Sequence, residues 1–340
     1  MINEVQIKEI HKHLEESENP LFFFDDDHDG LASFLLLWRS VKKGHGVLIK
    51  GPPFVDMSYI KKIHEYKADK LFILDKPVLS QEFVDQVNIP IIYIDHHKVN
   101  KLKGVHYYNP QFNDVKDNRP AAYWCYKVVK QDIWIATVGS VGDYHVPDFI
   151  EQFKKEHPTL VPEKLTINEL LYNSKLGKLI KIFNFILKCN TSDTMKCIKI
   201  LTRIETPEEI LNQETPRGRF LYRIFEKINK KYEAVYNDAI KTKPEGKLLL
   251  YTYAAKDSFT SVVSNEISYK HPDKIVIIAR RKDDRVIMSL RSTKIVLPPL
   301  IRKALDGIEG YGGGHDLASA ANVPEQDFTR FIDQLKAQII

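Results

Sequence analysis

Residues 20–30 read Pro-Leu-Phe-Phe-Phe-Asp-Asp-Asp-His-Asp-Gly, an apolar run that ends abruptly in acidic side chains. A short run that is continuously apolar is typical of a strand buried on both faces of a parallel sheet. The carboxylates that follow it are costly to bury unless a cation neutralises them. This stretch therefore predicts a buried strand that delivers carboxylates to one edge of a sheet.

The first 150 residues repeat this apolar pattern in three further segments, 70–74, 90–94 and 133–138. Between these predicted strands, residues 31–42 and 80–87 carry apolar side chains at helical spacing, which predicts β–α–β units with right-handed crossovers. We therefore expect an α/β fold built on a doubly wound, mainly parallel sheet. In such folds ligands bind outside the carboxyl ends of the strands.

The pattern becomes purely helical after about residue 158 and returns to strands after a linker at residues 241–246. Beyond the linker, strand patterns at 248–253, 275–280 and 285–290 surround a helical one at 259–268 and predict a second, smaller α/β domain. The expected organisation has three parts, namely a catalytic domain at 1–157, a helical connector at 158–243 and the smaller domain at 244–340.

The composition sets limits on the class of protein. The 340 residues include 50 Lys and Arg against 45 Asp and Glu, and 43% are apolar. This balance excludes a histone-like polycation and a disordered chain, and it supports more than one core. No apolar run approaches the ~20 residues of a membrane span, and the N-terminus lacks an apolar signal core. With only three cysteines in no metal-binding spacing, we expect a cytoplasmic protein without membrane contact.

Acidic or imidazole side chains follow each of the four predicted strands. Carboxylates combined with imidazole suit Mn²⁺, oxygen-rich sites also admit Mg²⁺, and the lack of cysteine ligands argues against structural zinc. An EF-hand is rejected, because Leu36 stands where that loop needs a glutamate. Acids that only complement a helix dipole would explain the first group alone. The groups are Asp25 to Asp29, then Asp75, then Asp95-His96-His97, and finally Asp143.

These residues, in this order, resemble the DHH phosphoesterase superfamily. Asp27-His28-Asp29-Gly30 is similar to its first motif, Leu74-Asp75 to its second, Asp95-His96-His97 to the motif that names it, and Gly142-Asp143 to its fourth. Ser289-Leu290-Arg291-Ser292 and Gly312-Gly313-Gly314-His315 resemble the DHH-associated domain of RecJ-type exonucleases and nanoRNases. The resemblance covers the two α/β parts and leaves the helical connector out.

The resemblance implies two Mn²⁺ ions, with Mg²⁺ as an alternative, acting on a phosphodiester. It implies that His97 orients the water or phosphate and that Asp95 holds the histidine pair. His28 stands where the family places a small residue, and we expect it to face solvent or to lie behind the ligands. The implied metal ligands are Asp75 as the bridge, Asp27 on one ion, Asp29, His96 and Asp143 on the other, and Asp25 as a further ligand or orienting carboxylate.

In the smaller domain the resemblance implies a substrate-binding surface. The glycines would let a loop approach a phosphate closely, and residues 316–321 would open a helix after the loop. The implied substrate-binding residues are Arg291, Ser292, Gly312, Gly313, Gly314 and His315.

The helical connector is locally basic, with eight Lys and Arg against two acidic residues between positions 164 and 203. Such a strip could follow a nucleic-acid backbone, although lysines on solvated helix faces are also ordinary. The first hypothesis is a RecJ-like exonuclease, active in DNA repair, that releases mononucleotides from single-stranded DNA or RNA.

Two alternatives stay open. One is a nanoRNase-like enzyme acting on short oligonucleotides, cyclic dinucleotides or bisphosphorylated nucleotides. The other is an inactive scaffold that binds a replication or repair protein partner. An inorganic polyphosphatase is disfavoured, because DHH enzymes of that kind carry a different C-terminal domain.

Overall fold

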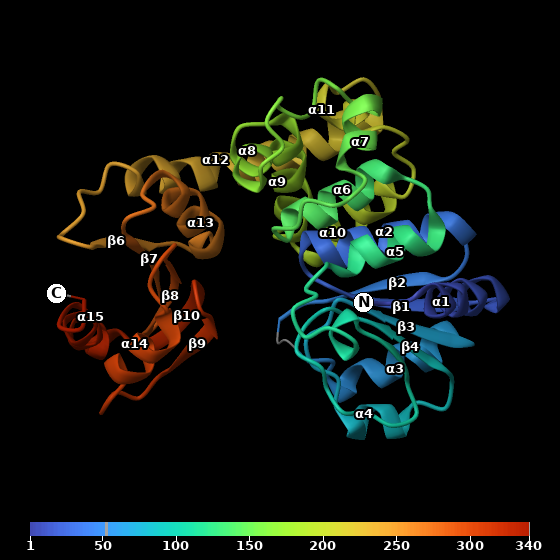
Figure 1. The fold of residues 1–340 in the computed structure, drawn as a ribbon, viewed down its shortest axis with the longest axis horizontal. Coiled ribbons are helices and arrows are strands. Elements are labelled where there is room, and N and C mark those ends of the chain that lie inside the picture. The colour runs from blue at the N-terminus through green and yellow to red at the C-terminus, as the bar shows by residue number, and fades with distance from the viewer. Residues whose placement is uncertain (52–53, 340) are drawn as a thin grey trace. The chain divides into compact units, whose positions relative to one another are not determined.

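The computed structural model describes residues 1–51 and 54–339, which pack as two compact units (Figure 1). The units are Met1–Phe225 and Glu226–Ile340. Each unit contains its own five-stranded sheet. The predicted α/β fold is confirmed, whereas the three-part division into domains stays a prediction.

The sheet of the first unit is wholly parallel, as the continuous apolar runs predict. Its strand order is β2-β1-β3-β4-β5, so the direction of winding reverses between β1 and β3. In doubly wound folds this switch point is where a crevice opens at the carboxyl ends of the strands. The strands are β1 (Pro20–Asp25), β2 (His45–Ile49), β3 (Lys70–Leu74), β4 (Ile91–Ile94) and β5 (His106–Tyr108).

Helices cover both faces of this sheet (Figure 1). Leu21 and Phe23 of β1 belong to the core on the face of α3 and α4. Phe22 and Phe24 point to the other face, where their rings lie 5.7 and 4.6 Å from the ring of Phe34 on α2. Both faces are therefore apolar, which explains the unbroken hydrophobicity of the strand. The helices are α1 (Glu4–Glu16), α2 (His28–Val41), α3 (Ile60–Tyr66), α4 (Gln81–Gln86) and α5 (Ala121–Val129).

The prediction of a strand at residues 133–138 is wrong. These residues begin the helix α6 (Ile133–Gly142), in which every residue is buried. A helix buried on all sides has the same unbroken hydrophobicity as a central strand, so periodicity cannot separate the two. Asp143 consequently lies at the C-terminal end of a helix.

Residues after α6 are helical up to the end of the first unit, as the sequence predicts. Helices α8 and α9 pack on α6, and α9 also contacts α2. Within the described residues, no helix has both the length and the apolarity needed to cross a bilayer. These helices are α7 (Ile150–Glu156), α8 (Ile167–Tyr172), α9 (Lys175–Leu187), α10 (Thr191–Leu201), α11 (Pro207–Leu211) and α12 (Pro216–Ala239), the last of which continues into the second unit.

The second unit has a mixed sheet in the order β6-β7-β8-β10-β9. Its first pair, β6 and β7, is parallel, and the other pairs are antiparallel. Helices α14 and α15 contribute Ile301 and Phe331 to its core. The elements are β6 (Leu248–Ala254), α13 (Thr260–Lys270), β7 (Ile275–Lys282), β8 (Arg285–Arg291), α14 (Leu297–Ala304), β9 (Tyr311–His315), β10 (Ala318–Pro324) and α15 (Phe328–Lys336).

The predicted glycine loop and following helix at residues 312–321 are wrong. The glycines lie in β9, and residues 318–324 form β10, which pairs with β9 as a hairpin. A side chain on Gly312 would meet Ile301 at 2.6 Å, so this glycine permits close packing of the strand on α14. The alanines of 318–321 indicated a helix, but pairing with β8 and β9 outweighs that weak local preference.

We predict that Gly139→Ala destabilises the first unit by about 1–3 kcal/mol. A Cβ at this position in α6 would lie 2.5 Å from the Cβ of Ala122 and 2.8 Å from the Cβ of Ala32, so the helices must move apart. Chemical denaturation measures the change. The neighbouring Ser140→Ala is the control, because it removes a buried hydroxyl that has no partner. Equal stability of the two variants would contradict this account of the packing.

Candidate active site

The acidic and imidazole residues meet where the carboxyl ends of β1, β3 and β4 adjoin. Asp25 ends β1, Asp75 directly follows β3, and Asp95, His96 and His97 directly follow β4. Asp75 is buried and has a left-handed backbone with φ of 58°, an uncommon conformation for a residue with a side chain. The sheet topology thus brings these five residues to the switch point.

The N-terminus of α2 adds two carboxylates to this edge. Asp27 caps the helix, and its side chain accepts the Gly30 N–H at 2.9 Å. Asp29 lies in the first turn, fully buried, and accepts the N–H groups of Ala121 and Ala122 at 2.8 Å each. These two donors belong to the first turn of α5, so both carboxylates are held by helix N-termini.

His96 faces three of the carboxylates. Its Nε2 lies 3.3 Å from Asp75 Oδ1, 3.4 Å from Asp143 Oδ2 and 3.9 Å from Asp29 Oδ2. Its Nδ1 lies 3.1 Å from the carbonyl oxygen of Asn118, which can only accept a hydrogen bond. Nδ1 therefore carries the proton in the neutral ring, and the lone pair of Nε2 faces the carboxylates.

His97 is held by Asp95. The Nδ1 of His97 lies 2.7 Å from Asp95 Oδ1, and its backbone N–H donates to Asp95 Oδ2 at 3.1 Å. Tyr107 and Asn109 also donate to this buried carboxylate, which fixes its orientation. Asp95 therefore orients the imidazole and leaves its Nε2 as the atom that can exchange a proton.

Clustering of the carboxylates shifts their pKa values. Burial, followed by the charges of Asp29, Asp27 and Asp143, raises the pKa of Asp75 well above its usual value. Burial raises the pKa of Asp29 to about 6 against the opposing effect of His96. Burial also raises the pKa of Asp143. These raised pKa values mean that the protein's own cations do not neutralise the carboxylates of the cluster.

Asp27 and His97 shift toward their charged forms. Burial favours a neutral Asp27, but the charge of His28 and the Gly30 N–H together hold its pKa below the ordinary value. Burial lowers the pKa of His97, but its hydrogen bond to Asp95 raises the pKa overall.

The residues fit divalent cations. Two groups of three side chains have ligand atoms within 4.8 Å of one another, and both groups contain His96. Asp75 Oδ1 is buried without a hydrogen-bond partner, as expected of an oxygen that awaits a cation. The groups are Asp75, His96 and His97, and Asp29, His96 and Asp143. Asp27 belongs to neither group, although its pKa responds to Asp75.

Lys76 is a site residue that the sequence analysis missed. Its fully buried ammonium lies 2.7 Å from Asp25 Oδ1, and its carbonyl accepts the Tyr93 hydroxyl. Burial and Asp27 raise the pKa of Asp25 to about 6, and Lys76 opposes that rise. The sequence did contain an indication of this role. Lys76 directly follows Asp75 at the end of one predicted strand, and the acidic residues 25–29 follow a neighbouring strand.

Of the two placements expected for His28, the structure shows the one behind the ligands. Its Nδ1 lies 3.1 Å from Asn184 Oδ1 of α9, and its Nε2 is buried without a partner. The ring packs on Gly142, where an added Cβ would lie 2.0 Å from His28 Cδ2. His28 therefore packs behind Asp27 and Asp143.

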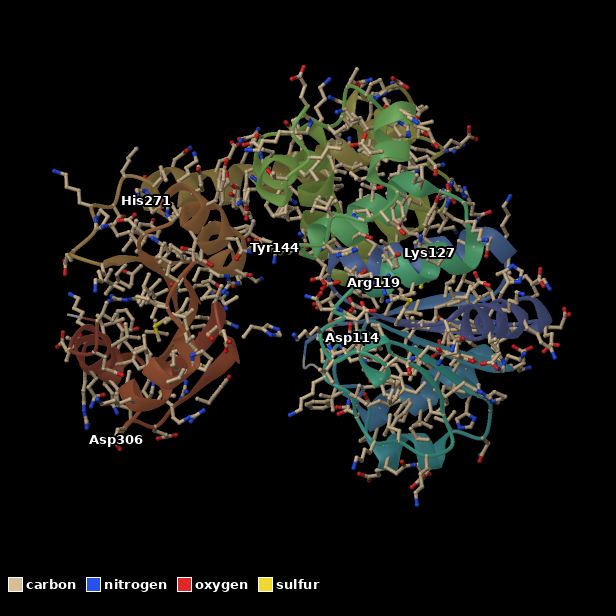
Figure 2. The ribbon with its side chains drawn as sticks, viewed as in Figure 1. Asp114, Arg119, Lys127, Tyr144, His271 and Asp306 are labelled. Atoms are coloured by element: carbon tan, nitrogen blue, oxygen red, sulfur yellow. The ribbon has the colours of Figure 1, made fainter. Side chains whose placement is uncertain are left out.

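The segment before α5 supports His96 and was also missed. Arg119, which Figure 2 labels, pairs with Asp117 at 2.5 Å and lies over the ring of Trp124 at 4.4 Å. These two contacts anchor the backbone on both sides of Asn118. Tyr144, directly after Asp143, is half exposed and has φ of 60° (Figure 2). Neither feature has a signal in the sequence, because both depend on tertiary contacts.

In the second unit, Arg291 and Ser292 are engaged with their own domain. The guanidinium of Arg291 donates to Asn265, to Ser261 at 3.0 Å and to the carbonyl of Ser319 at 3.2 Å. The Ser292 hydroxyl accepts the N–H of Ile295 at 2.9 Å, which turns the chain toward α14. His315 at the end of β9 is exposed, and Gly313 has open space where a side chain would be.

Comparisons with known proteins agree with this architecture. Residues 248–340 match the family model of the DHHA1 domain. Over the whole chain, the structure is similar to RecJ of Thermus thermophilus in complex with Mn²⁺, with a TM-score of 0.69 and 15% identity over 99% of this chain and 55% of that one. The chain thus spans about half the length of that RecJ.

Two shorter proteins match along most of their length. The DHH domain of a protein from a family of ribosomal proteins has a TM-score of 0.70 and 14% identity, over 98% of this chain and 90% of that one. The pGpG-specific phosphodiesterase PggH from Vibrio cholerae has a TM-score of 0.52 and 16% identity, over 94% and 98%. A search of curated proteins found no match. At these identities, the structural likenesses show the fold.

We predict that Mn²⁺ raises the Tm of the protein more at about pH 7.5 than at about pH 5. Asp29, which belongs to one of the ligand groups, has a pKa raised to about 6 and is protonated at the lower pH, so an ion must displace its proton. In the metal-free protein the same shift lowers stability as pH rises from about 4 toward 6, because the carboxyl of the unfolded chain ionises first. Thermal unfolding with and without Mn²⁺ at both pH values measures the difference.

The control for this measurement is Asp75→Asn, which keeps the shape of a protonated carboxyl. It should retain the metal-free Tm and lose the increase produced by Mn²⁺ at both pH values. An equal increase in Tm at the two pH values for the unsubstituted protein would contradict the assignment of these carboxylates to a cation.

Proposed function

Because the chain has the RecJ-like fold of the DHH phosphoesterase superfamily and ends in a DHHA1 domain, we propose that it is a phosphodiesterase using two divalent cations, Mn²⁺ or Mg²⁺. The observation that carries the proposal is the pair of ligand groups that share His96 at the switch point of the sheet. The same arrangement argues against the inactive scaffold, because none of the six residues that the resemblance requires at the centre is replaced: Asp27, Asp29, Asp75, His96, His97 and Asp143.

The chain's own residues have separate tasks in this proposal. Asp29, Asp75, His96 and Asp143 hold the cations, and Asp25 is kept in place by Lys76. Asp27 is added to these ligands from the resemblance alone. When bound, two such ions lower the pKa of a water and neutralise the scissile phosphate. His97, oriented by Asp95 through Nδ1, holds the water or the phosphate with its Nε2.

The proposed substrate is single-stranded DNA or RNA, shortened from one end to mononucleotides. Support comes from the basic helices, where Lys175, Lys178, Lys188, Lys196 and Lys199 are exposed. A lysine-rich surface favours a polyanion and makes its binding sensitive to salt. Arg291 and the β9 glycines, with His315, would bind substrate phosphates in the second unit.

The alternative substrate is a short oligonucleotide, a cyclic dinucleotide or a bisphosphorylated nucleotide. The observation that favours it is the likeness along nearly the whole length of both chains to a phosphodiesterase named as pGpG-specific. A replication or repair partner, and a role in DNA repair, stay predictions from the sequence.

We predict that His96→Ala and Asp75→Asn each lower Mn²⁺-dependent hydrolysis by at least about 100-fold. His96→Ala removes the side chain that both ligand groups share, and Asp75→Asn removes the carboxylate of one group. A time course on end-labelled single-stranded DNA and RNA of several lengths measures the loss and gives the polarity, the sugar preference and the minimum length. Asp114→Asn is the matched control, because this aspartate is exposed and its Oδ1 accepts the backbone N–H of Lys116, which an asparagine can also accept. Near-normal activity in either site variant would refute the metal centre.

The substrate-binding residues of the second unit give a separate prediction. His315→Ala should weaken binding of a labelled oligonucleotide about tenfold and leave the Tm unchanged, because its side chain is exposed. Arg291→Ala should weaken binding and also lower the Tm, because its guanidinium joins α13, β8 and β10. Fluorescence anisotropy and thermal unfolding separate the two effects. Unchanged affinity in both variants would remove this surface from the proposal.

A further inference from the structure

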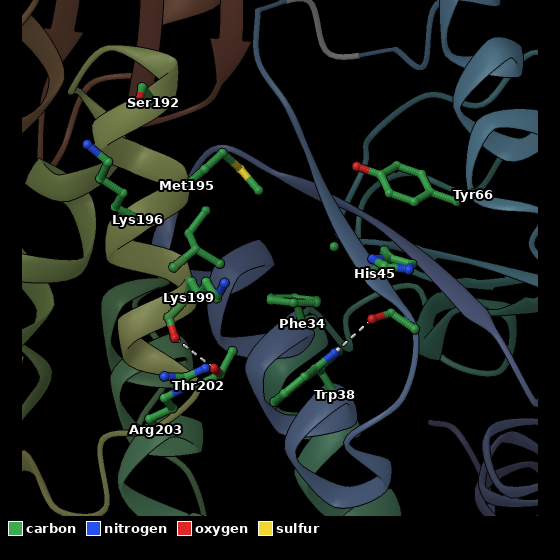
Figure 3. Close-up of a pocket in the computed structure, with 13 residues that line it drawn as sticks. Phe34, Trp38, His45, Tyr66, Ser192, Met195, Lys196, Lys199, Thr202 and Arg203 are labelled. Atoms are coloured by element: carbon green, nitrogen blue, oxygen red, sulfur yellow. Dashed lines mark hydrogen bonds between the residues drawn. The ribbon is translucent and has the colours of Figure 1, made fainter.

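A cavity of about 520 Å³ lies in the first unit, between α2, α10, the start of β2 and the end of α3 (Figure 3). Phe34 and Trp38 of α2 line one wall, His45 and Tyr66 line another, and α10 contributes Met195. A volume of this size matches the pockets that hold small organic ligands in proteins. No step proposed at the switch point uses any of these residues.

The aromatic walls of the cavity are held in place. The Nε1 of Trp38 donates to the Gly44 carbonyl at 3.2 Å, and the rings of His45 and Tyr66 stack with centroids 4.5 Å apart. Gly46 leaves room for Phe34, because a Cβ there would lie 2.5 Å from the Phe34 ring. Fixed aromatic faces suit a flat ligand that stacks, such as a nucleobase.

The rim of the cavity is cationic. Lys196, Lys199 and Arg203 line it, and no aspartate or glutamate of the described chain does. A second cavity of about 620 Å³ shares Trp38, Thr202 and Arg203 with the first. It adds Lys42, Arg39 and Arg217 together with the carboxylates Asp132 and Glu205, and Asp132 pairs with Arg39 at 2.7 Å. The aromatic walls thus adjoin Lys196, Lys199 and Arg203 at the rim of the first cavity, and these cations complement an anion attached to the stacked group.

We propose that this cavity binds a nucleotide, with the base against Trp38 and the phosphate at Lys199 and Arg203. The nucleotide is either free in solution or part of a single strand that passes over α10, and both sources present the same base and phosphate. The proposal uses none of the residues at the switch point, so it does not depend on the metal chemistry there, although it shares Lys196 and Lys199 with the basic helices that support the proposed substrate.

The site lies at the opposite end of the strands from the metal centre. In the pairing of β1 with β2, His45 lies beside Leu21 whereas Ile49 lies beside Asp25. Four residues of extended chain separate the two ends, which is ~13 Å along the sheet. A nucleotide at Trp38 is therefore a second ligand, separate from one positioned for hydrolysis.

Tryptophan fluorescence tests the proposal directly. The chain has three tryptophans, and Trp124 and Trp134 are buried with 2% and 3% exposed surface, so a stacking base should quench Trp38. The experiment titrates the Asp75→Asn protein, in the presence of EDTA, with AMP, with adenosine and with single-stranded oligodeoxyadenylate. We expect saturable quenching that Trp38→Phe abolishes, and weaker binding of adenosine because it lacks the phosphate.

Charge reversal tests the phosphate contact. The double substitution Lys199→Glu with Arg203→Glu should raise the Kd of the quenching ligand at least about tenfold. The matched control is Lys155→Glu, an exposed lysine of α7 that does not line the cavity and should leave the Kd unchanged. Circular dichroism checks that all variants are folded.

Each outcome decides the proposal. Quenching by AMP assigns a free nucleotide, and quenching by the oligonucleotide alone assigns a nucleotide within a strand. The proposal is overturned if neither ligand quenches Trp38 saturably, or if charge reversal leaves the Kd unchanged. Hydrolysis is measured separately on the unsubstituted protein with Mn²⁺, so hydrolysis there without quenching in the Asp75→Asn protein, or the reverse, shows which of the two proposals fails.

Discussion

The central constraint on the first unit is the mutual repulsion of the buried carboxylates at the carboxyl ends of its strands. Asp29 and Asp75 are almost wholly buried, and burial with neighbouring negative charge raises the pKa of both. Specific donors stabilise part of this buried negative charge. The N–H groups at the start of α5 donate to Asp29, and the Lys76 ammonium pairs with the neighbouring Asp25. These donors do not compensate for all the negative charge, and the remaining deficit of positive charge supports the proposal that the cluster binds cations.

Close packing of three helices places the carboxylates. Gly139 of α6 lies against Ala32 of α2 and Ala122 of α5, and a Cβ at Gly139 would also lie 3.4 Å from Asp29 Oδ1. Small side chains at this crossing let the N-terminus of α2 and the C-terminus of α6 approach His96 together. The three α-helices therefore determine the geometry of the site as much as the sheet does.

The sequence predicts the part of the site that local pattern controls. Asp25, Asp75 and Asp95 end apolar runs, and parallel topology brings the ends of such strands together. Asp143 was named both from its place after a predicted strand and from the resemblance, but the element before it is a helix, because a fully buried helix has the composition of a strand. Lys76 as a partner of Asp25, and Asn118 as the acceptor for His96, depend on contacts between distant segments that no local pattern encodes.

The net charge of +5 is a sum over regions of opposite charge, and two of these regions lie at the start and at the side of α2. Its first turn carries Asp29 beside the capping Asp27, at the end of the helix where the dipole favours negative charge. One and two turns later, Phe34 and Trp38 occupy one face, because residues four apart lie above each other on a helix. That face meets the cationic side chains of α10. A single rigid helix therefore presents an acidic end suited to cations and an aromatic side suited to an anion that carries a flat ring.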